Sequence, residues 1–166
     1  MDQQERINAL DLAMTNEMRE RKFYLKCAER TRDPLGRAMF QQIADDELEH
    51  YRVLKELQEK RSSDEKLPDT VPLKVRNTNL RSILKDVIDK MDMVSQVDDD
   101  ELEAVRTAID FEAKGEAYYA KLRDEVTDLK EKAFFDLLAN MEHQHYLILK
   151  ETEAYFTDPD SWFSKR

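Results

Sequence analysis

The chain contains two copies of one sequence pattern, and this duplication limits the folds that it can adopt. A shift of 95 residues carries His50 onto His145 and places many identical residues in register without a gap. Such a repeat predicts two equivalent units that pack about a pseudo-twofold axis. The matched pairs include Ala13/Ala108, Glu17/Glu112, Tyr24/Tyr119, Asp33/Asp128, Phe40/Phe135, Ala44/Ala139, Glu47/Glu142, Tyr51/Tyr146 and Leu54/Leu149.

Each copy has the composition and the start signals of a helical hairpin. Glycine and proline are scarce, with 2 and 4 among 166 residues, which leaves little material for the many tight turns of a β-sandwich or barrel. Charged residues make up 39% and hydrophobic residues 40% of the chain, a balance typical of long amphipathic helices. Asp33-Pro34 and Thr127-Asp128 are helix-start signals at the turns of the two hairpins. The four long helices are predicted over residues 4–32, 34–61, 98–125 and 128–156.

The segment between the hairpins is long, and its length predicts how they are connected. A crossover of about 36 residues can travel the length of a bundle, whereas a hop between neighbouring helices needs only a short loop. We therefore expect an all-α four-helix bundle in which the second and third long helices are parallel. Within the crossover, apolar residues at helical spacing predict a short helix over 80–94. The predicted single domain, 1–166, consists of hairpin 4–61, crossover 62–97, hairpin 98–156 and a C-terminal tail over 157–166.

Charge, cysteine content and hydropathy exclude several classes of protein. The net charge of −10 argues against general nucleic-acid binding, because no cationic surplus is available to neutralise phosphates. Cys27 is the only cysteine, which excludes an internal disulfide framework and a cysteine-rich metal or iron–sulfur site. No apolar run approaches the roughly 20 residues of a membrane span, and the first residues lack the apolar core of a signal peptide. We expect a soluble, cytoplasmic protein that binds neither nucleic acid nor membranes.

Two of the three histidines end a Glu-x-x-His motif, which places a carboxylate and an imidazole on the same face of a helix. Glu17 precedes Glu47 by 30 residues, and Glu112 precedes Glu142 by the same interval. At about 1.5 Å of rise per residue from the turn, each lone glutamate stands level with its own motif across the hairpin. If the hairpins form one bundle, six side chains converge near its middle: Glu17, Glu47, His50, Glu112, Glu142 and His145.

Four carboxylates and two imidazoles form a ligand set that suits iron or manganese at a two-metal site. The set fits less well the closed tetrahedral geometry of structural zinc. The alternative is a duplicated hairpin kept for packing alone, which explains matched apolar pairs such as Phe40 and Phe135. It does not explain the joint burial of four glutamates and two histidines, which is very costly without a partner such as a metal ion.

The sequence around both motifs shows a wider pattern that covers most of the chain apart from the crossover. Residues 9–57 contain Glu17, Phe23-Tyr24, Asp33-Pro34, Phe40 and Asp45-Asp46-Glu47-Leu48-Glu49-His50, and residues 108–156 contain Glu112, Gly115, Tyr118-Tyr119 and Glu142-His143-Gln144-His145. This pattern resembles the rubrerythrin-like branch of the ferritin-like superfamily. The resemblance implies a ferritin-like four-helix bundle.

The resemblance also implies a non-haem di-iron carboxylate protein. Its cofactors would be two iron ions, with manganese or zinc as metals that isolated protein could hold instead, and the six converging side chains would be the ligands. In the family, a tyrosine at the position of Tyr24, and by the repeat Tyr119, lies close to the ligands, where its hydroxyl can hydrogen-bond to one of them. The alternative role for both tyrosines is an aromatic core residue whose hydroxyl is satisfied elsewhere.

Two departures from the family pattern bear on function. Rubrerythrins carry an extra carboxylate three residues after the third-helix glutamate, but Gly115 stands at that place. The equivalent place in the first half is Glu20. We therefore expect that the first half of the repeat, and not the second, supplies the seventh carboxylate, with Gly115 leaving room opposite. The alternative is a solvent-exposed Glu20. Rubrerythrins also carry a four-cysteine rubredoxin domain, which this chain with its single cysteine lacks. Electrons would then come from a separate donor, a rubredoxin-like protein or a flavin reductase.

Three functions are consistent with these features. The first is an oxidoreductase, a di-iron peroxidase or oxidase that reduces hydrogen peroxide or dioxygen with electrons from that donor. The second is an iron-handling protein of ferritin type, which oxidises Fe²⁺ and stores it or passes it on. The third is a non-catalytic, metal-dependent structural module, which the predominance of carboxylates disfavours. The paired Glu-x-x-His motifs and Phe23-Tyr24 favour the first function, and we expect a homodimer or larger homo-oligomer.

Overall fold

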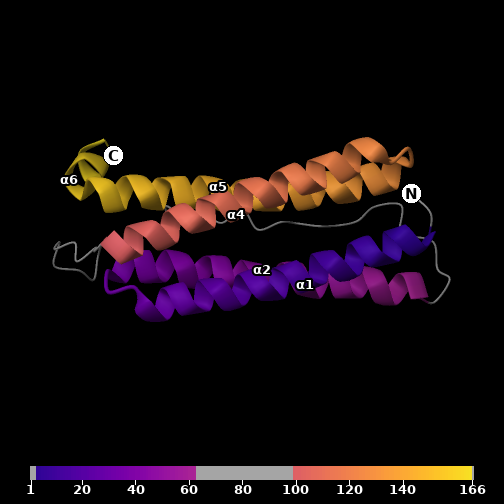
Figure 1. Ribbon diagram of the computed structural model, residues 1–166, viewed down its shortest axis with the longest axis horizontal. Coiled ribbons are helices and arrows are strands. Elements are labelled where there is room, and N and C mark those ends of the chain that lie inside the picture. Colours follow the sequence, from indigo (N-terminus) through magenta and orange to yellow (C-terminus); the bar gives the residue numbers. More distant parts are fainter. Residues whose placement is uncertain (1–2, 63–98, 166) are drawn as a thin grey trace.

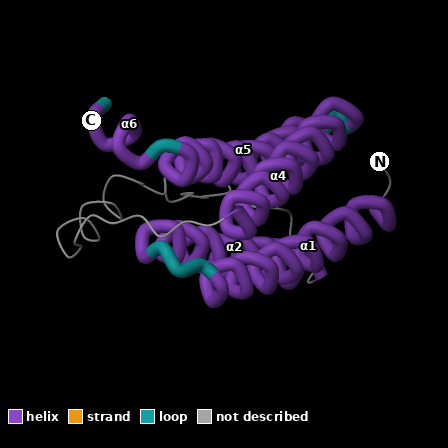
Figure 2. Tube along the Cα trace, turned by 60° about the vertical axis from the view of Figure 1, so that its left-hand side comes forward, coloured by secondary structure: helices purple, strands orange, loops and turns teal. Residues whose placement is uncertain are grey.

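The computed structural model describes residues 3–62 and 99–165, and within these ranges it consists of helices and short connections (Figures 1 and 2). The short helix predicted over 80–94 lies outside the described residues. No helix in the described ranges has the length and apolarity needed to cross a membrane. The long helices end within about two residues of the predicted positions. The helices are α1 (Gln3–Arg30), α2 (Pro34–Ser62), α4 (Asp99–Glu125), α5 (Leu129–Thr157) and α6 (Pro159–Ser164).

The directions of the four long helices agree with a long crossover. In Figure 1, α1 and α2 form one antiparallel hairpin, and α4 and α5 form the other. Across the two hairpins, α1 packs beside α4 and α2 packs beside α5. Helices α2 and α4 run in the same direction, so the end of α2 and the start of α4 lie at opposite ends of the bundle. The bundle is therefore not of the up-down-up-down type, and its fold is the expected ferritin-like one.

Matching aspartates begin the second helix of each hairpin. Oδ1 of Asp33 accepts a hydrogen bond of 2.9 Å from the backbone N–H of Gly36. Asp128 accepts hydrogen bonds of 2.9 and 3.0 Å from the backbone N–H groups of Lys130 and Glu131. Such caps satisfy N–H groups that the first helical turn leaves without a partner. They fix the turn positions, and the turn positions set the level of every residue along the hairpins.

Two apolar clusters fill the bundle and leave a polar layer between them. One cluster contains Phe40 and Leu149 and the other contains Leu54 and Leu138, all at most 1% exposed. Along each long helix, the predicted ligands lie between residues of one cluster and residues of the other. The polar layer therefore stands near the middle of the bundle, at the level that the equal spacings predict. Packed apolar side chains on both sides strengthen electrostatic interactions within the layer.

The C-terminal residues, predicted as a tail, fold in part as the short helix α6. Asp158 caps this helix by accepting a hydrogen bond of 3.0 Å from the backbone N–H of Ser161, and Pro159 occupies its first turn. Trp162 is buried and meets the ring of Tyr155 edge to face, with centroids 5.4 Å apart. The apolar end of the chain thus covers one end of its own core rather than remaining free.

Candidate metal centre

The structure brings all six predicted ligands together in the polar layer, and each long helix contributes to the cluster. All six side chains are buried, and the four carboxylates are at most 1% exposed. Their ligand atoms, with those of Glu20, form three overlapping groups in which all atoms lie within 4.8 Å of one another. These groups are Glu47/His50/His145, Glu17/Glu20/Glu142 and Glu20/Glu47/Glu112.

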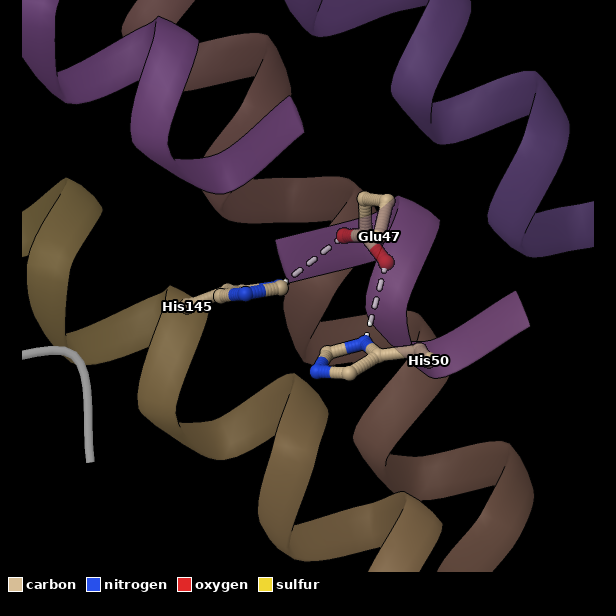
Figure 3. A group of neighbouring side chains, drawn as sticks. All are labelled: Glu47, His50 and His145. Carbon is tan, nitrogen blue, oxygen red and sulfur yellow. Dashed lines mark hydrogen bonds and ion pairs between the residues drawn. The ribbon is translucent and has the colours of Figure 1, made fainter. Parts of the chain in front are cut away.

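Glu47 lies between the two histidines (Figure 3). Its Oε2 is 3.2 Å from Nδ1 of His50, and its Oε1 is 2.9 Å from Nδ1 of His145, a close contact that is not aligned as a hydrogen bond. The same nitrogen of His50 is 3.1 Å from Glu17, and that of His145 is 3.7 Å from Glu112. Each histidine therefore faces the lone glutamate of its own hairpin. Glu47 itself turns one oxygen to each imidazole, so it offers a donor atom beside either histidine.

Several buried polar atoms in this cluster lack a hydrogen-bond partner, and this bears on whether a metal cation fits there. A buried polar atom without a hydrogen-bond partner costs about 1–3 kcal/mol, more when it is charged, and native proteins contain few such atoms. Here five of them belong to predicted ligands and lie in one layer. Metal ions would satisfy them all at once, so the donor set fits a metal centre. The atoms are Oε1 of Glu17, Oε1 of Glu47, Oε2 of Glu112, Oε2 of Glu142 and Nδ1 of His145.

Without a metal ion, the crowded carboxylates take up protons. Burial and the nearby charge of Glu47 raise the pKa of Glu17 to about 8. Burial, Glu47 and Glu112 raise the pKa of Glu20 to about 10. Burial opposes a charge on His145, but Glu47 and Glu112 outweigh it and raise the pKa of the imidazole well above its usual value. Metal ions compete with these protons for the same atoms, so we expect metal binding to release protons.

Glu20 belongs to the cluster, although the second half offers no counterpart for it. Its ligand atoms lie within 4.8 Å of those of Glu17 and Glu142 in one group and of two further carboxylates in another. The structure therefore favours a seventh carboxylate over a solvent-exposed side chain. Gly115 leaves room for Glu142 rather than for Glu20, because a Cβ atom at Gly115 would lie 2.3 Å from Oε2 of Glu142.

Tyr24 and Tyr119 occupy equivalent places but differ in their hydrogen bonds. The Tyr24 hydroxyl donates to Oε1 of Glu112 across the bundle. The Tyr119 hydroxyl is buried beside Asn16, but no hydrogen bond of normal geometry forms there. Burial, reinforced by Glu112, raises the pKa of Tyr24 well above its usual value, so the hydroxyl keeps its proton. Tyr24 thus orients one predicted ligand, and Tyr119 presents an unused hydroxyl to the cluster.

Asp46 is a further residue of the site; it directly precedes a predicted ligand in sequence, a position from which it could orient an imidazole. Its Oδ2 is 3.4 Å from Nε2 of His145, on the side of the ring away from Glu47. A carboxylate at this nitrogen holds the ring so that the other nitrogen points at the metal position. Met141 stands at the equivalent place in the second half, so the repeat provides no matching aspartate for His50.

A comparison with family models agrees with this geometry. The model described as Rubrerythrin matches residues 8–153, a span that includes both hairpins and every predicted ligand. The chain belongs to the rubrerythrin family. No curated protein and no solved structure gives a significant match. Rubrerythrins typically bind iron, and the Glu/His cluster of this family member offers a fitting site for it.

Proposed function

We propose that this rubrerythrin-family protein is a non-haem di-iron oxidoreductase that reduces hydrogen peroxide or dioxygen with electrons from a separate donor protein. The observation that most supports this function is the buried layer of carboxylates and imidazoles in which five donor atoms lack a partner. Mixed oxygen and nitrogen donors of this kind suit iron. The apolar clusters on both sides limit the access of bulk water to the layer.

The side chains around the layer would hold two iron ions in defined positions. Bound iron would supply the redox chemistry, namely electrons for cleavage of an O–O bond. Glu47 would be among the residues that hold the ions, and its two oxygens face different histidines. Tyr24 holds Glu112 by a hydrogen bond, and Asp46 holds the ring of His145. These contacts fix donor atoms in advance of metal binding, which is the usual role of residues just outside a metal site.

Glu20 gives the proposed function an additional donor. Reduction of one hydrogen peroxide molecule to two water molecules consumes two electrons and two protons. Six ligands shared between two positions leave little freedom to respond to a change of oxidation state. A seventh carboxylate beside Glu17 and Glu142 would give the centre one more donor than the six predicted ligands. This additional donor supports turnover of an oxidant more than simple retention of metal.

We propose that the electrons come from a rubredoxin-like protein or a flavin reductase. Cys27 is the only cysteine of the chain, and it is buried, so the chain cannot form a four-cysteine iron site of its own. The encounter would take place in the cytoplasm, with the chain as part of a homodimer or larger homo-oligomer. Purified candidate donors can be tested directly by following the rate at which each one reduces the oxidised protein under argon.

Stopped-flow oxidation of the reduced, iron-loaded protein tests the proposed activity. Metal analysis first establishes the iron content of the chain, for which we expect two ions. The reduced protein should then be oxidised faster by hydrogen peroxide than by dioxygen, because a pair of ferrous sites can deliver two electrons together. Faster oxidation by dioxygen, together with an iron core that grows beyond two ions per chain, would instead establish the iron-handling function.

A further inference from the structure

A cleft opens between α1 and α4 directly above the polar layer. Its volume is about 420 Å³, and it is open to solvent on one side. The two helices that form it are neighbours from different hairpins (Figures 1 and 2). The cleft is therefore a product of the bundle and not of either hairpin alone. Its lining comprises Asn16, Arg19, Glu20, Phe23, Phe111, Lys114, Gly115, Tyr118 and Tyr119.

The lining is made of residues that the internal repeat relates to each other. Four of its members on α1 have their partners 95 residues later on α4, also in the lining. The pseudo-twofold axis between the hairpins thus runs through the cleft. Two pairs keep a similar chemistry, one of cations and one of aromatic rings, whereas one pairs an amide with an aromatic ring and another pairs a carboxylate with a glycine. The pairs are Asn16/Phe111, Arg19/Lys114, Phe23/Tyr118 and Glu20/Gly115.

The Glu20/Gly115 pair connects the cleft to the metal centre. Glu20 lines the cleft, and its ligand atoms also belong to two of the three groups that could hold an ion. Gly115 lines the cleft as well, and the space that its missing side chain leaves is taken by Glu142. Tyr119 is a third shared residue, with its unpartnered hydroxyl buried near the carboxylates. A small molecule at the base of the cleft would therefore meet donor atoms of the metal centre.

The cleft has two cationic side chains, which bear on the kind of small molecule that it admits. Arg19 and Lys114 are both exposed and stand at equivalent places on the two helices. Asp110 lies 2.6 Å from the ammonium of Lys114 and offsets part of its charge, whereas the carboxyl group of Glu20 lies among the donor atoms of the metal centre. An entrance with two cations disfavours Fe²⁺ and favours neutral or anionic molecules.

We propose that the cleft between α1 and α4 is the route by which small neutral or anionic ligands reach the metal centre, and that Fe²⁺ enters elsewhere. This inference rests on the proposed di-iron function for the presence of the metal. It assigns Arg19, Tyr118 and Lys114 a role in access, although none of them belongs to the predicted ligand set. The route also accounts for Phe111 and Tyr118, which are exposed aromatic residues at its rim.

A label attached to the rim tests the route. In the Tyr118→Cys variant, the new thiol can be alkylated with either a small acetamide or a bulky maleimide. Cys27 does not interfere, because it is buried and burial raises the pKa of its thiol to about 11, so little reactive thiolate forms. Leu147→Cys on α5 is the matched control, since Leu147 is 44% exposed, close to the 37% of Tyr118, and does not line the cleft.

Azide binding to the iron-loaded, oxidised protein, followed by absorbance, gives a readout that needs no turnover. With the bulky label at position 118, azide association and dissociation should both slow by about tenfold or more, while the equilibrium constant stays within about twofold, because an obstructed path changes rates and not end states. The small label should have a much weaker effect, and the labelled Leu147→Cys control should have none. Unchanged azide rates at position 118, or equal slowing in the control, would overturn the route.

Two further measurements separate this inference from its alternatives. Fe²⁺ uptake by metal-free protein should proceed at the same rate with and without the bulky label, and equal slowing of uptake would overturn the separate entry of metal. The Arg19→Glu variant should reduce the azide association rate severalfold at low ionic strength and less at high salt, because the charge effect is screened. If azide follows the cleft but peroxide is not reduced, the proposed activity fails and the route stands.

Discussion

Replacement of Glu20 by glutamine should stabilise the metal-free protein, because the buried acid must gain a proton when the chain folds. In the unfolded chain Glu20 ionises near its usual pKa of 4.5, whereas in the folded chain its pKa is about 10. Below pH 4.5 the side chain is already protonated in the unfolded chain, so folding carries no free-energy cost of protonation. That cost grows as the pH rises above 4.5. At about 1.4 kcal/mol per pH unit, protonation at pH 7 costs about 3 kcal/mol. Glutamine has the shape of the neutral acid and carries no such cost, so Glu20→Gln should gain about 2–3 kcal/mol.

Urea unfolding of both metal-free proteins at about pH 5, 6 and 7 measures this gain. The difference in unfolding free energy should be small at the lowest pH and should grow by about 1.4 kcal/mol per unit. Glu29→Gln, at an exposed position on the same helix, is the matched control and should show no such growth. A Glu20→Gln protein that is no more stable than the parent at pH 7, or a difference that does not depend on pH, would place Glu20 in solvent and refute the reasoning.

Three further changes probe the rest of the cluster. Glu47→Ala removes the carboxylate that faces both histidines, so metal analysis of the purified variant should show fewer than two ions per chain. Gly115→Ala places a Cβ atom 2.3 Å from Oε2 of Glu142, so a chelator should remove metal from this variant faster than from the parent. Tyr24→Phe leaves an oxygen of Glu112 without its donor and should lower the unfolding free energy of the metal-free protein by about 1–2 kcal/mol, measured by urea titration, while two metal ions still bind.

The fold could be predicted in detail because the chain repeats itself and contains few helix breakers. Asp33 and Asp128 mark the turns, and the structure shows capping hydrogen bonds at both. The length between the hairpins predicted parallel α2 and α4, which Figure 1 shows. The C-terminal residues were the exception: Asp158 and Pro159 provide a start signal for α6, but a helix of six residues also needs packing such as the contact of Trp162 with Tyr155.

The convergence of the site could be predicted from spacing, but its contacts could not. Helical rise and equal intervals place the six ligands at one level, and the structure has them there. Spacing along one helix says nothing about which residue on a facing helix fills a gap, so it did not show that Gly115 accommodates Glu142. The contact between Asp46 and His145 also depends on how α2 and α5 are rotated against each other. These features are set by packing between hairpins, for which the sequence contains no periodic signal.

The centre departs from the repeat, and the departure begins with its ligands: Glu47 faces both histidines, whereas its repeat partner Glu142 belongs to a group that contains neither. The six predicted ligands obey the repeat in sequence. The residues around them do not obey the repeat. Gly115 stands at the place in the second half that corresponds to Glu20, and Tyr24 has a hydrogen bond that Tyr119 lacks. Because Glu20 belongs both to the cluster and to the lining of the cleft, a molecule in the cleft would meet a carboxylate that has no counterpart in the second half. A duplicated hairpin can thus supply matching ligand residues from both halves and still surround them with residues that differ.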